Sequence, residues 1–144
     1  YKVSLIEENI RHHQVTNMTA EQWDARVSDK GSIGKADVVI ADLPCSGLGV
    51  LRKKPDIKYR MQPEDIKSLI ALQREILSTV HQYVKPGGRM IYSTCTIDAG
   101  ENEENVAWFM ANHKEFEVES MEQILPDELG SDGFFIARLR KQNV

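Results

Sequence analysis

The sequence predicts an α/β domain built on a mostly parallel sheet. Short apolar runs typical of strands alternate with longer segments of helical periodicity, in the order strand, helix, strand, helix, strand, strand. Two of the strand-like runs lead directly into irregular loops, as strands do at the edge of a sheet. No internal repeat, low-complexity tract or clear linker interrupts the 144 residues, a length that fits one domain or part of one.

The first 35 residues carry the weakest structural signals. Residues 2–13 indicate a helix remnant, because apolar residues recur there at roughly helical spacing. Residues 15–23 predict a short strand that ends before Asp24, and residues 28–35 predict a loop with Gly and Ser. The chain begins with Tyr1 rather than Met, so we expect this end to have been cut or processed.

A strand, a loop and a helix follow in the centre of the chain. Residues 37–41 form a continuous apolar run, which predicts a strand buried on both faces. Residues 42–49 contain Pro and two Gly, which indicates a tight irregular loop. Pro63 suits the first turn of a helix whose apolar stripe extends to Val84, and residues 86–88 (Pro-Gly-Gly) are expected to end it.

The C-terminal half predicts a second buried strand, another helix and two final strands. The buried strand covers residues 89–93, with Thr-Cys-Thr at its exit (94–96). The acidic residues of 101–104 open the next helix, where negative charge favours the positive end of the helix dipole. Residues 116–119 and 134–139 predict the last two strands.

Cys45 and Cys95 both lie just past a predicted strand, and Asp42 lies at the same edge. Handedness rules place these two strands side by side, and open α/β sheets bind ligands at the carboxyl ends of their strands. Two thiols and a carboxylate in one cleft would provide a nucleophile with an acid–base partner. Each cysteine alone is also compatible with a small buried apolar residue.

Composition limits the class of protein. Only two cysteines are present and no zinc spacing occurs, which favours free thiols in a reducing cytoplasm. No apolar run approaches the roughly 20 residues that span a membrane. The net charge of −4 argues mildly against binding of nucleic acid by the whole surface, so a local basic patch would be needed.

One local basic patch is present, between the first cysteine and the long helix. It is opposed only by Asp56 and consists of Arg52, Lys53, Lys54, Lys58 and Arg60. A phosphate-binding surface and a solvated loop are both compatible with this pattern. Gln73 interrupts the apolar stripe of the long helix, which indicates either a backbone partner or a support for the loop that holds Cys45. The four histidines indicate no metal site.

Residues 42–47 (Asp-Leu-Pro-Cys-Ser-Gly) together with residues 92–96 (Tyr-Ser-Thr-Cys-Thr) resemble the paired signature of the Sun/Nop family of RNA cytosine-5 methyltransferases. The resemblance covers most of the chain and is closest to the bacterial Sun-type members that methylate small-subunit ribosomal RNA. Further matching motifs are Pro55–Lys58, Leu72–Leu77, Lys85–Gly88, Glu101–Asn105 and Asp132–Phe135.

The resemblance implies a Rossmann-like class I methyltransferase sheet with an antiparallel C-terminal strand, and S-adenosyl-L-methionine as cofactor. It assigns to Cys95 the attack on carbon 6 of cytosine, which makes carbon 5 nucleophilic. It assigns to Asp42 a hydrogen bond at N3, and to Cys45 help with release. DNA cytosine-5 methyltransferases instead use the cysteine of the Pro-Cys loop as nucleophile, and the residues alone do not choose between the two thiols.

The resemblance assigns cofactor contacts to Asp24, Asp42, Leu43 and Pro44. The Gly-rich cofactor loop of the family and its acidic ribose-binding residue have no counterpart here. We therefore expect residues 1–144 to be the C-terminal part of a single catalytic domain whose N-terminal part is missing, with weak cofactor binding on its own. Two other classes remain open: a non-catalytic module that binds RNA or a partner, and a thiol redox protein, although the sequence lacks Cys-x-x-Cys.

Overall fold

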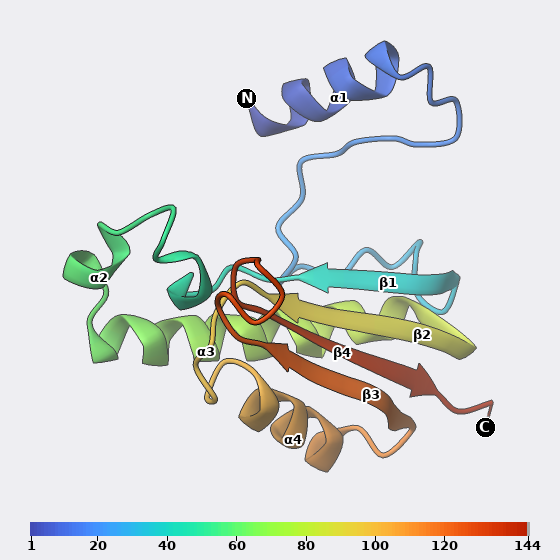
Figure 1. Cartoon of the computed structure of the whole chain (residues 1–144). Coiled ribbons are helices and arrows are strands. Elements are labelled where there is room, and N and C mark those ends of the chain that lie inside the picture. Colours follow the sequence, from blue (N-terminus) through green and yellow to red (C-terminus); the bar gives the residue numbers. More distant parts are fainter. Residues whose placement is uncertain (144) are drawn as a thin grey trace.

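The computed structural model describes residues 1–143, which contain one four-stranded sheet of order β1-β2-β4-β3 (Figure 1). The strands are β1 (Ala36–Asp42), β2 (Val84–Thr94), β3 (Phe116–Ile124) and β4 (Phe134–Lys141). β1 and β2 are parallel, whereas β4 is antiparallel to both of its neighbours. The antiparallel C-terminal strand is therefore confirmed, and the sheet of the described residues is mixed rather than mostly parallel.

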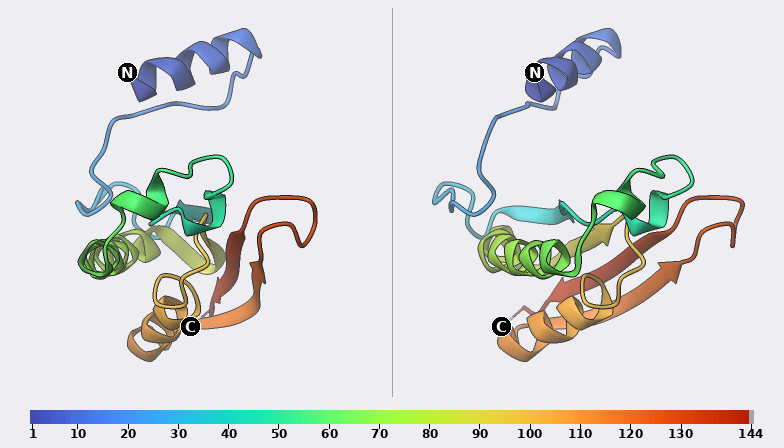
Figure 2. Two further views of the ribbon diagram at one scale, coloured as in Figure 1. Left: turned by 60° about the vertical axis from the view of Figure 1, so that its left-hand side comes forward. Right: turned by 90° about the vertical axis from the view of Figure 1, so that its left-hand side faces the viewer.

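Two helices, α3 (Pro63–Val80) and α4 (Glu103–Asn112), cover one face of the sheet (Figure 2). α3 begins as the sequence predicts, with Pro63 in its first turn and the Asp65 carboxylate accepting a hydrogen bond from the Gln62 amide at 2.9 Å. Between the helices and the sheet lies the core, which includes Leu77, Met90, Tyr92, Phe109, Phe135 and Leu139. No helix in residues 1–143 is both long and apolar enough to cross a membrane.

The long helix ends earlier than the sequence predicts. α3 stops at Val80 and continues as a short 3-10 helix, η2 (His81–Tyr83), so Pro86-Gly87-Gly88 lies inside β2 instead of ending the helix. A side chain at Gly88 would approach the Asp37 carbonyl oxygen to 2.9 Å, so glycine allows β1 and β2 to pair closely at this point. The register of this pair is irregular here.

β1 lies at the end of the strand order and is open to solvent on one face. Val38 and Ile40 are 52% and 72% exposed, whereas Ala41, on the face toward the helices, is buried. The prediction of burial on both faces is therefore wrong for the described residues. The reason is that α3 and α4 lie on one side of the sheet, and no other described element covers the opposite side of β1.

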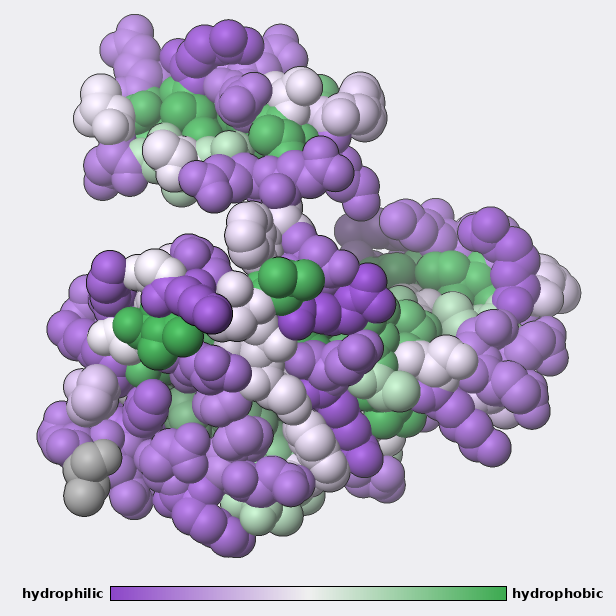
Figure 3. All heavy atoms as spheres, turned by 180° about the vertical axis from the view of Figure 1, so that it is seen from behind, coloured by the Kyte–Doolittle hydropathy of each residue, from purple (hydrophilic) through white to green (hydrophobic). Residues whose placement is uncertain are grey.

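The N-terminal region stands apart from the sheet (Figures 1 and 3). Helix α1 (Lys2–His12) confirms the predicted helix at residues 2–13, but none of its residues is buried. The strand predicted at residues 15–23 is wrong: this segment is extended and pairs with no strand in residues 1–143. β propensity alone does not make a strand, because the backbone groups of a strand need a neighbouring strand as partner.

Candidate active site

Two thiols meet at the edge of the sheet where β1 and β2 end. Cys45 lies in the loop after β1 and Cys95 lies directly after β2. Their Sγ atoms are 3.2 Å apart although the residues are 50 positions apart in the sequence. Both cysteines are half-buried and free. The prediction that the two strands run side by side is confirmed, because Asp42 and Ser93 are register partners.

Asp42 is the last residue of β1 and lies at this same edge. Its Oδ1 accepts a hydrogen bond of 2.9 Å from the Ser93 hydroxyl, and the next backbone amide, that of Leu43, donates to the Ser93 carbonyl oxygen. The Asp42 side chain remains exposed. The structure therefore presents an oriented carboxylate to solvent at the end of the strand that leads to Cys45.

The loop that carries Cys45 is held on both sides of the cysteine. On one side, Gln73 of α3 donates through Nε2 to the Pro44 carbonyl oxygen at 2.9 Å. On the other side, the Ser46 amide and hydroxyl donate to the two carboxylate oxygens of Glu101, at 2.8 Å and 2.6 Å. The expectation that Gln73 has a backbone partner and supports this loop is met in both respects.

The segment that carries Cys95 is tied to the same loop. The Ser46 and Thr96 hydroxyls are 2.8 Å apart and hydrogen-bonded, and the Asn102 amide group donates to the Thr96 carbonyl oxygen at 2.9 Å. The Gly49 amide donates to the Cys95 carbonyl oxygen at 2.9 Å. These contacts join the residues next to each thiol, so they fix the position of one cysteine relative to the other.

Gly49 allows three segments of backbone to meet behind the thiols. A side chain there would lie 2.5 Å from the Gly133 carbonyl oxygen and 2.7 Å from that of Cys95. The Gly133 amide donates to the Gly49 carbonyl oxygen at 2.8 Å. Only glycine permits this approach of the loop after β1 to the exit of β2 and the start of β4.

The two thiols have different surroundings. Burial and, to a smaller extent, the hydrogen bond with Cys95 together raise the pKa of Cys45 to about 12. Cys45 therefore stays protonated at neutral pH, and its S–H can donate to the sulfur of Cys95. A thiol in this state is a poor nucleophile but a suitable hydrogen-bond donor.

Asp24 lies on an exposed turn after the N-terminal arm. Its carboxylate binds Arg26 at 2.8 Å, and this side-chain hydrogen bond lowers the pKa of Asp24 to about 2. Within residues 1–143, no hydrogen bond or ion pair joins Asp24 to Asp42, Leu43 or Pro44. The structure thus places Asp42, Leu43 and Pro44 in succession at the thiol edge, and Asp24 on a separate turn.

The predicted basic patch lies in the turn that follows η1 (Leu48–Val50) and in α2 (Ile57–Arg60). Three of its five members form ion pairs: Arg52 with Asp127, Lys53 with Asp132 at 2.7 Å, and Arg60 with Asp56. The first two pairs connect the patch to the turn between β3 and β4. Lys54 and Lys58 are exposed and have no ion-pair partner in the part of the chain that the structure describes.

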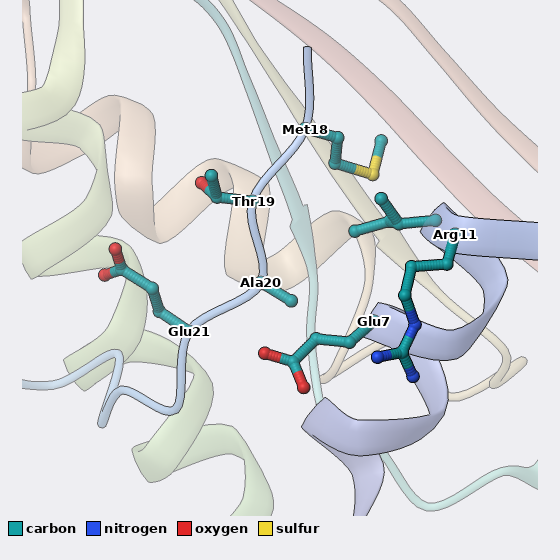
Figure 4. Close-up of a pocket in the computed structure, with 7 residues that line it drawn as sticks. Glu7, Arg11, Met18, Thr19, Ala20 and Glu21 are labelled. Carbon is teal, nitrogen blue, oxygen red and sulfur yellow. The ribbon is translucent and has the colours of Figure 1, made fainter. Parts of the chain in front are cut away.

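Hollows lie on the N-terminal side of the molecule, away from the thiols, and the two of largest volume are these. One, of about 550 Å³, lies between α1 and the extended segment 18–21, with Glu7 and Arg11 on one wall and Glu21 on the other (Figure 4). The second, of about 490 Å³, lies beside β1 and includes Trp23, Val38 and Tyr83. Both are open to solvent, because nothing in residues 1–143 covers α1 or the free edge of β1.

The structure brings together two histidines for which the sequence predicts no role. Donor atoms of His81, His113 and Glu115 lie within 4.8 Å of one another, a spacing that metal ligands can have. The His81 ring instead hydrogen-bonds the Leu77 carbonyl oxygen at 2.9 Å, and the His113 ring stacks on Phe109 with 4.4 Å between centroids. These contacts explain the cluster as packing at the end of α3 and α4.

Residues 1–140 match the family model described as 16S rRNA methyltransferase RsmB/F. The chain belongs to this family. It is 39% identical to the "Probable ribosomal RNA small subunit methyltransferase B" of Bacillus subtilis, over 99% of this chain and 36% of that protein. It is 32% identical to the "Ribosomal RNA small subunit methyltransferase F" of Cronobacter sakazakii, over 97% of this chain and 33% of that protein.

Solved structures agree with the fold. PH0851 superimposes with a TM-score of 0.91 at 30% identity, covering 96% of this chain and 34% of that one. NSun6 from Pyrococcus horikoshii, solved with the ligand SFG, superimposes with a TM-score of 0.76 at 28% identity, covering 94% and 38%. The chain thus spans about a third of the length of its relatives, and the Rossmann-like methyltransferase fold expected from the sequence is confirmed.

Sequence reasoning missed the part that Glu101 plays. The acidic run was expected to act at a helix terminus, and Glu103 and Glu104 do lie in the first turn of α4. Glu101 precedes the helix and is completely buried. A usable signal was present, because an acidic side chain shortly after a strand exit faces the same edge as the residues of that exit.

Proposed function

We propose that the protein containing this chain uses S-adenosyl-L-methionine to methylate carbon 5 of a cytosine in RNA, with small-subunit ribosomal RNA in the cytoplasm as its substrate. The observation that carries the proposal is the 3.2 Å contact between the thiols of Cys45 and Cys95 at the exits of two neighbouring strands. Membership of the family and the printed names of the relatives support an RNA substrate.

The proposed chemistry begins with the Cys95 thiolate, which forms a bond between its sulfur and carbon 6 of cytosine. Asp42 hydrogen-bonds the ring at N3 and delivers a proton there as the electron pair moves to carbon 5, and it takes that proton back when the ring is restored. The cofactor supplies an electrophilic methyl group to carbon 5. A base then removes the proton from carbon 5, the bond between sulfur and carbon 6 breaks, and Cys95 leaves as a thiolate.

The raised pKa of Cys45 supports this division of roles between the thiols. Cys45 remains an S–H donor, and its hydrogen bond stabilises negative charge on the Cys95 sulfur both before attack and when that sulfur is expelled. The opposite assignment would require the thiol with the raised pKa to ionise first. The raised pKa of Cys45 thus favours the choice that the residues alone left open.

The cofactor site is only partly represented in the chain. Asp42, Leu43 and Pro44 occupy the strand exit where ligands of α/β sheets bind, and Asp24 offers an ionised carboxylate, so these residues fit contacts to a small charged cofactor. We propose that residues 1–144 form the C-terminal part of a single catalytic domain. The free edge of β1 and the coverage of 36% of the Bacillus subtilis relative support this proposal.

The isolated chain should therefore bind S-adenosyl-L-methionine weakly. Titration calorimetry of the isolated chain should detect little heat at cofactor concentrations that saturate the complete protein. Tight binding with one cofactor per chain would contradict the proposal that part of the site lies outside these residues.

The basic patch is proposed to bind RNA phosphates, with Lys54 and Lys58 available and Arg52, Lys53 and Arg60 first exchanging their acidic partners. Replacing both lysines by Ala in the complete protein should weaken RNA binding and reduce the slope of log K against log salt by about 1 to 2. Lys30→Ala with Lys35→Ala removes the same charge elsewhere and serves as the matched control.

The decisive experiment uses the complete protein with Cys45→Ala, mixed with RNA and cofactor. Because release is impaired, we expect a protein–RNA adduct that survives denaturation and maps by mass spectrometry to Cys95. The double variant Cys45→Ala/Cys95→Ala is the control and should form none. If an adduct forms only in the Cys95→Ala variant and maps to Cys45, then Cys45 is the nucleophile and the two roles are exchanged.

Other outcomes would favour the other classes of protein. If the unmodified protein binds RNA but neither methylates it nor forms an adduct, a non-catalytic RNA-binding module becomes the better explanation. A dithiol redox protein would form a reversible disulfide between Cys45 and Cys95, and measurement of the thiol–disulfide potential tests that role.

A further inference from the structure

A buried carboxylate lies behind the two thiols, and the proposed chemistry gives it no role. Glu101 is completely inaccessible to solvent and takes part in none of the ion pairs of residues 1–143. An unpaired buried carboxylate is costly unless several donors stabilise it. Its surroundings therefore indicate what keeps it there.

Three donors point at the Glu101 carboxylate. The Ser46 amide and the Gln73 side-chain amide donate to Oε1, at 2.8 Å and 3.1 Å, and the Ser46 hydroxyl donates to Oε2 at 2.6 Å. The Ser46 hydroxyl thereby uses its only proton, so Thr96 must donate in the Ser46–Thr96 hydrogen bond. The direction of every bond follows from the acceptor character of Glu101.

A relay of side chains connects this carboxylate to a cation. Arg74 donates through Nε to Asn105 Oδ1 at 2.9 Å, and Asn105 donates through Nδ2 to Gln73 Oε1 at 2.8 Å. Gln73 then donates to Glu101, as above. All three donors point toward the carboxylate, so each bond polarises the next. The guanidinium itself lies over the Trp108 ring, 5.0 Å from its centroid.

We infer that Glu101 is a positioning residue, which holds the Cys45 loop against the Cys95 segment and thereby fixes the distance between the two thiols. Its contacts lie at Ser46, next to Cys45, and reach Thr96, next to Cys95, through the Ser46 hydroxyl. Glu101 touches neither thiol. Its consequence for methyl transfer rests on the proposed function, whereas its effect on the thiols does not.

The test compares Glu101→Ala with Glu101→Gln in the complete protein. A glutamine keeps the carbonyl acceptor for the Ser46 and Gln73 amides and can donate to the Ser46 hydroxyl, which then turns toward Thr96. We expect Glu101→Ala to lower kcat by about a hundredfold with KM values within about threefold, because misplacement by about 1 Å costs this much. Glu101→Gln should retain most of the activity.

A second readout is independent of methyl transfer. Alkylation of Cys45 by iodoacetamide at about pH 9, followed by peptide mass spectrometry, should become at least about tenfold faster in Glu101→Ala. The physical reason is that a released loop exposes a thiol that burial keeps protonated. Phe109→Ala is the control, because it weakens the core without touching the loop and should change neither kcat nor the alkylation rate of the folded protein.

The two readouts separate the outcomes. The inference would be overturned if folded Glu101→Ala kept both its kcat and the alkylation rate of Cys45. It would also be overturned if kcat fell while the alkylation rate of Cys45 stayed the same. If the unmodified protein does not methylate RNA while Cys45 alkylation responds to Glu101→Ala, the proposed function fails and the positioning role stands. If Glu101→Ala does not fold, Ser46→Ala removes the hydroxyl link alone and should lower kcat about tenfold; no change would overturn the inference.

Discussion

The N-terminal region (residues 1–35) and the sheet edge that holds the two thiols differ in which kinds of residue they bury and which they expose. At the thiol edge, Glu101, Asn102 and Asn105 are polar yet fully buried, and each has several hydrogen-bond partners. In the N-terminal region, Leu5 and Ile6 are apolar yet 41% and 47% exposed. The difference shows which region is complete in itself: the polar groups of the thiol edge have their partners within the chain, whereas the apolar residues of α1 are buried by none of residues 1–143.

Hydrogen exchange should give the largest contrast between the two regions. In the isolated chain, amides of β2 and β4 should exchange about a thousandfold or more slowly than those of α1, because α1 buries no residue and an 11-residue helix is marginal without packing. Amide exchange followed by NMR measures both in one sample. Equal protection would show that α1 packs against something in solution, and the comparison would fail.

Matched truncations should give the next largest effect. Phe109→Ala removes a side chain that is 1% exposed in α4 and should lower the free energy of unfolding by about 3 to 5 kcal/mol. Ile6→Ala truncates an apolar side chain of α1 and should change the free energy of unfolding by less than about 0.5 kcal/mol. Urea unfolding measures both. A large loss for Ile6→Ala would mean that the N-terminal region belongs to the folded unit.

An alkaline titration sharpens the comparison at the thiol edge. The pKa of Cys45 is raised from an ordinary 9.0 to about 12, so the unfolded chain loses the proton first. Stability from this group is therefore complete below pH 9 and is lost as the pH rises toward about 12. The free energy of unfolding, measured across this range, should fall more steeply with pH in the unmodified chain than in Cys45→Ala. Identical slopes would contradict the burial of the thiol.

The smallest effect concerns the exposed turn at Asp24. The pKa of Asp24 is lowered from 3.8 to about 2 by Arg26. The contribution of this carboxylate to stability is therefore present above pH 3.8 and is lost as the pH falls toward about 2. An NMR titration of the carboxyl carbon should give a midpoint near 2, and Arg26→Ala should return it toward 3.8. Because both side chains are exposed, Asp24→Asn should leave the melting temperature unchanged.

Local patterns predicted the elements that depend on local forces. The first turn of α3 and its apolar stripe, and the two C-terminal strands, are as expected, because capping, periodicity and turn residues act over a few positions. The meeting of Cys45 and Cys95 was also predictable, since handedness places consecutive parallel strands together.

What depends on distant partners was not predictable. Glu101 is buried because Ser46, 55 positions away, and Gln73, 28 positions away, supply donors, and no local pattern reports such a pairing. Residues 15–23 have the composition of a strand but lack a neighbour, and Val38 and Ile40 belong to a run typical of buried strands but lack a cover.

The free edge of β1 has a practical consequence for handling the chain. Its unpaired backbone donors and acceptors lie beside Val38 and Ile40, which is the arrangement through which sheets of separate molecules join and aggregate. The isolated chain should therefore self-associate as its concentration rises, and light scattering should detect this. Val38→Lys, four positions before Asp42 and so toward the opposite end of β1 from the thiols, should improve solubility by placing a charge on that edge.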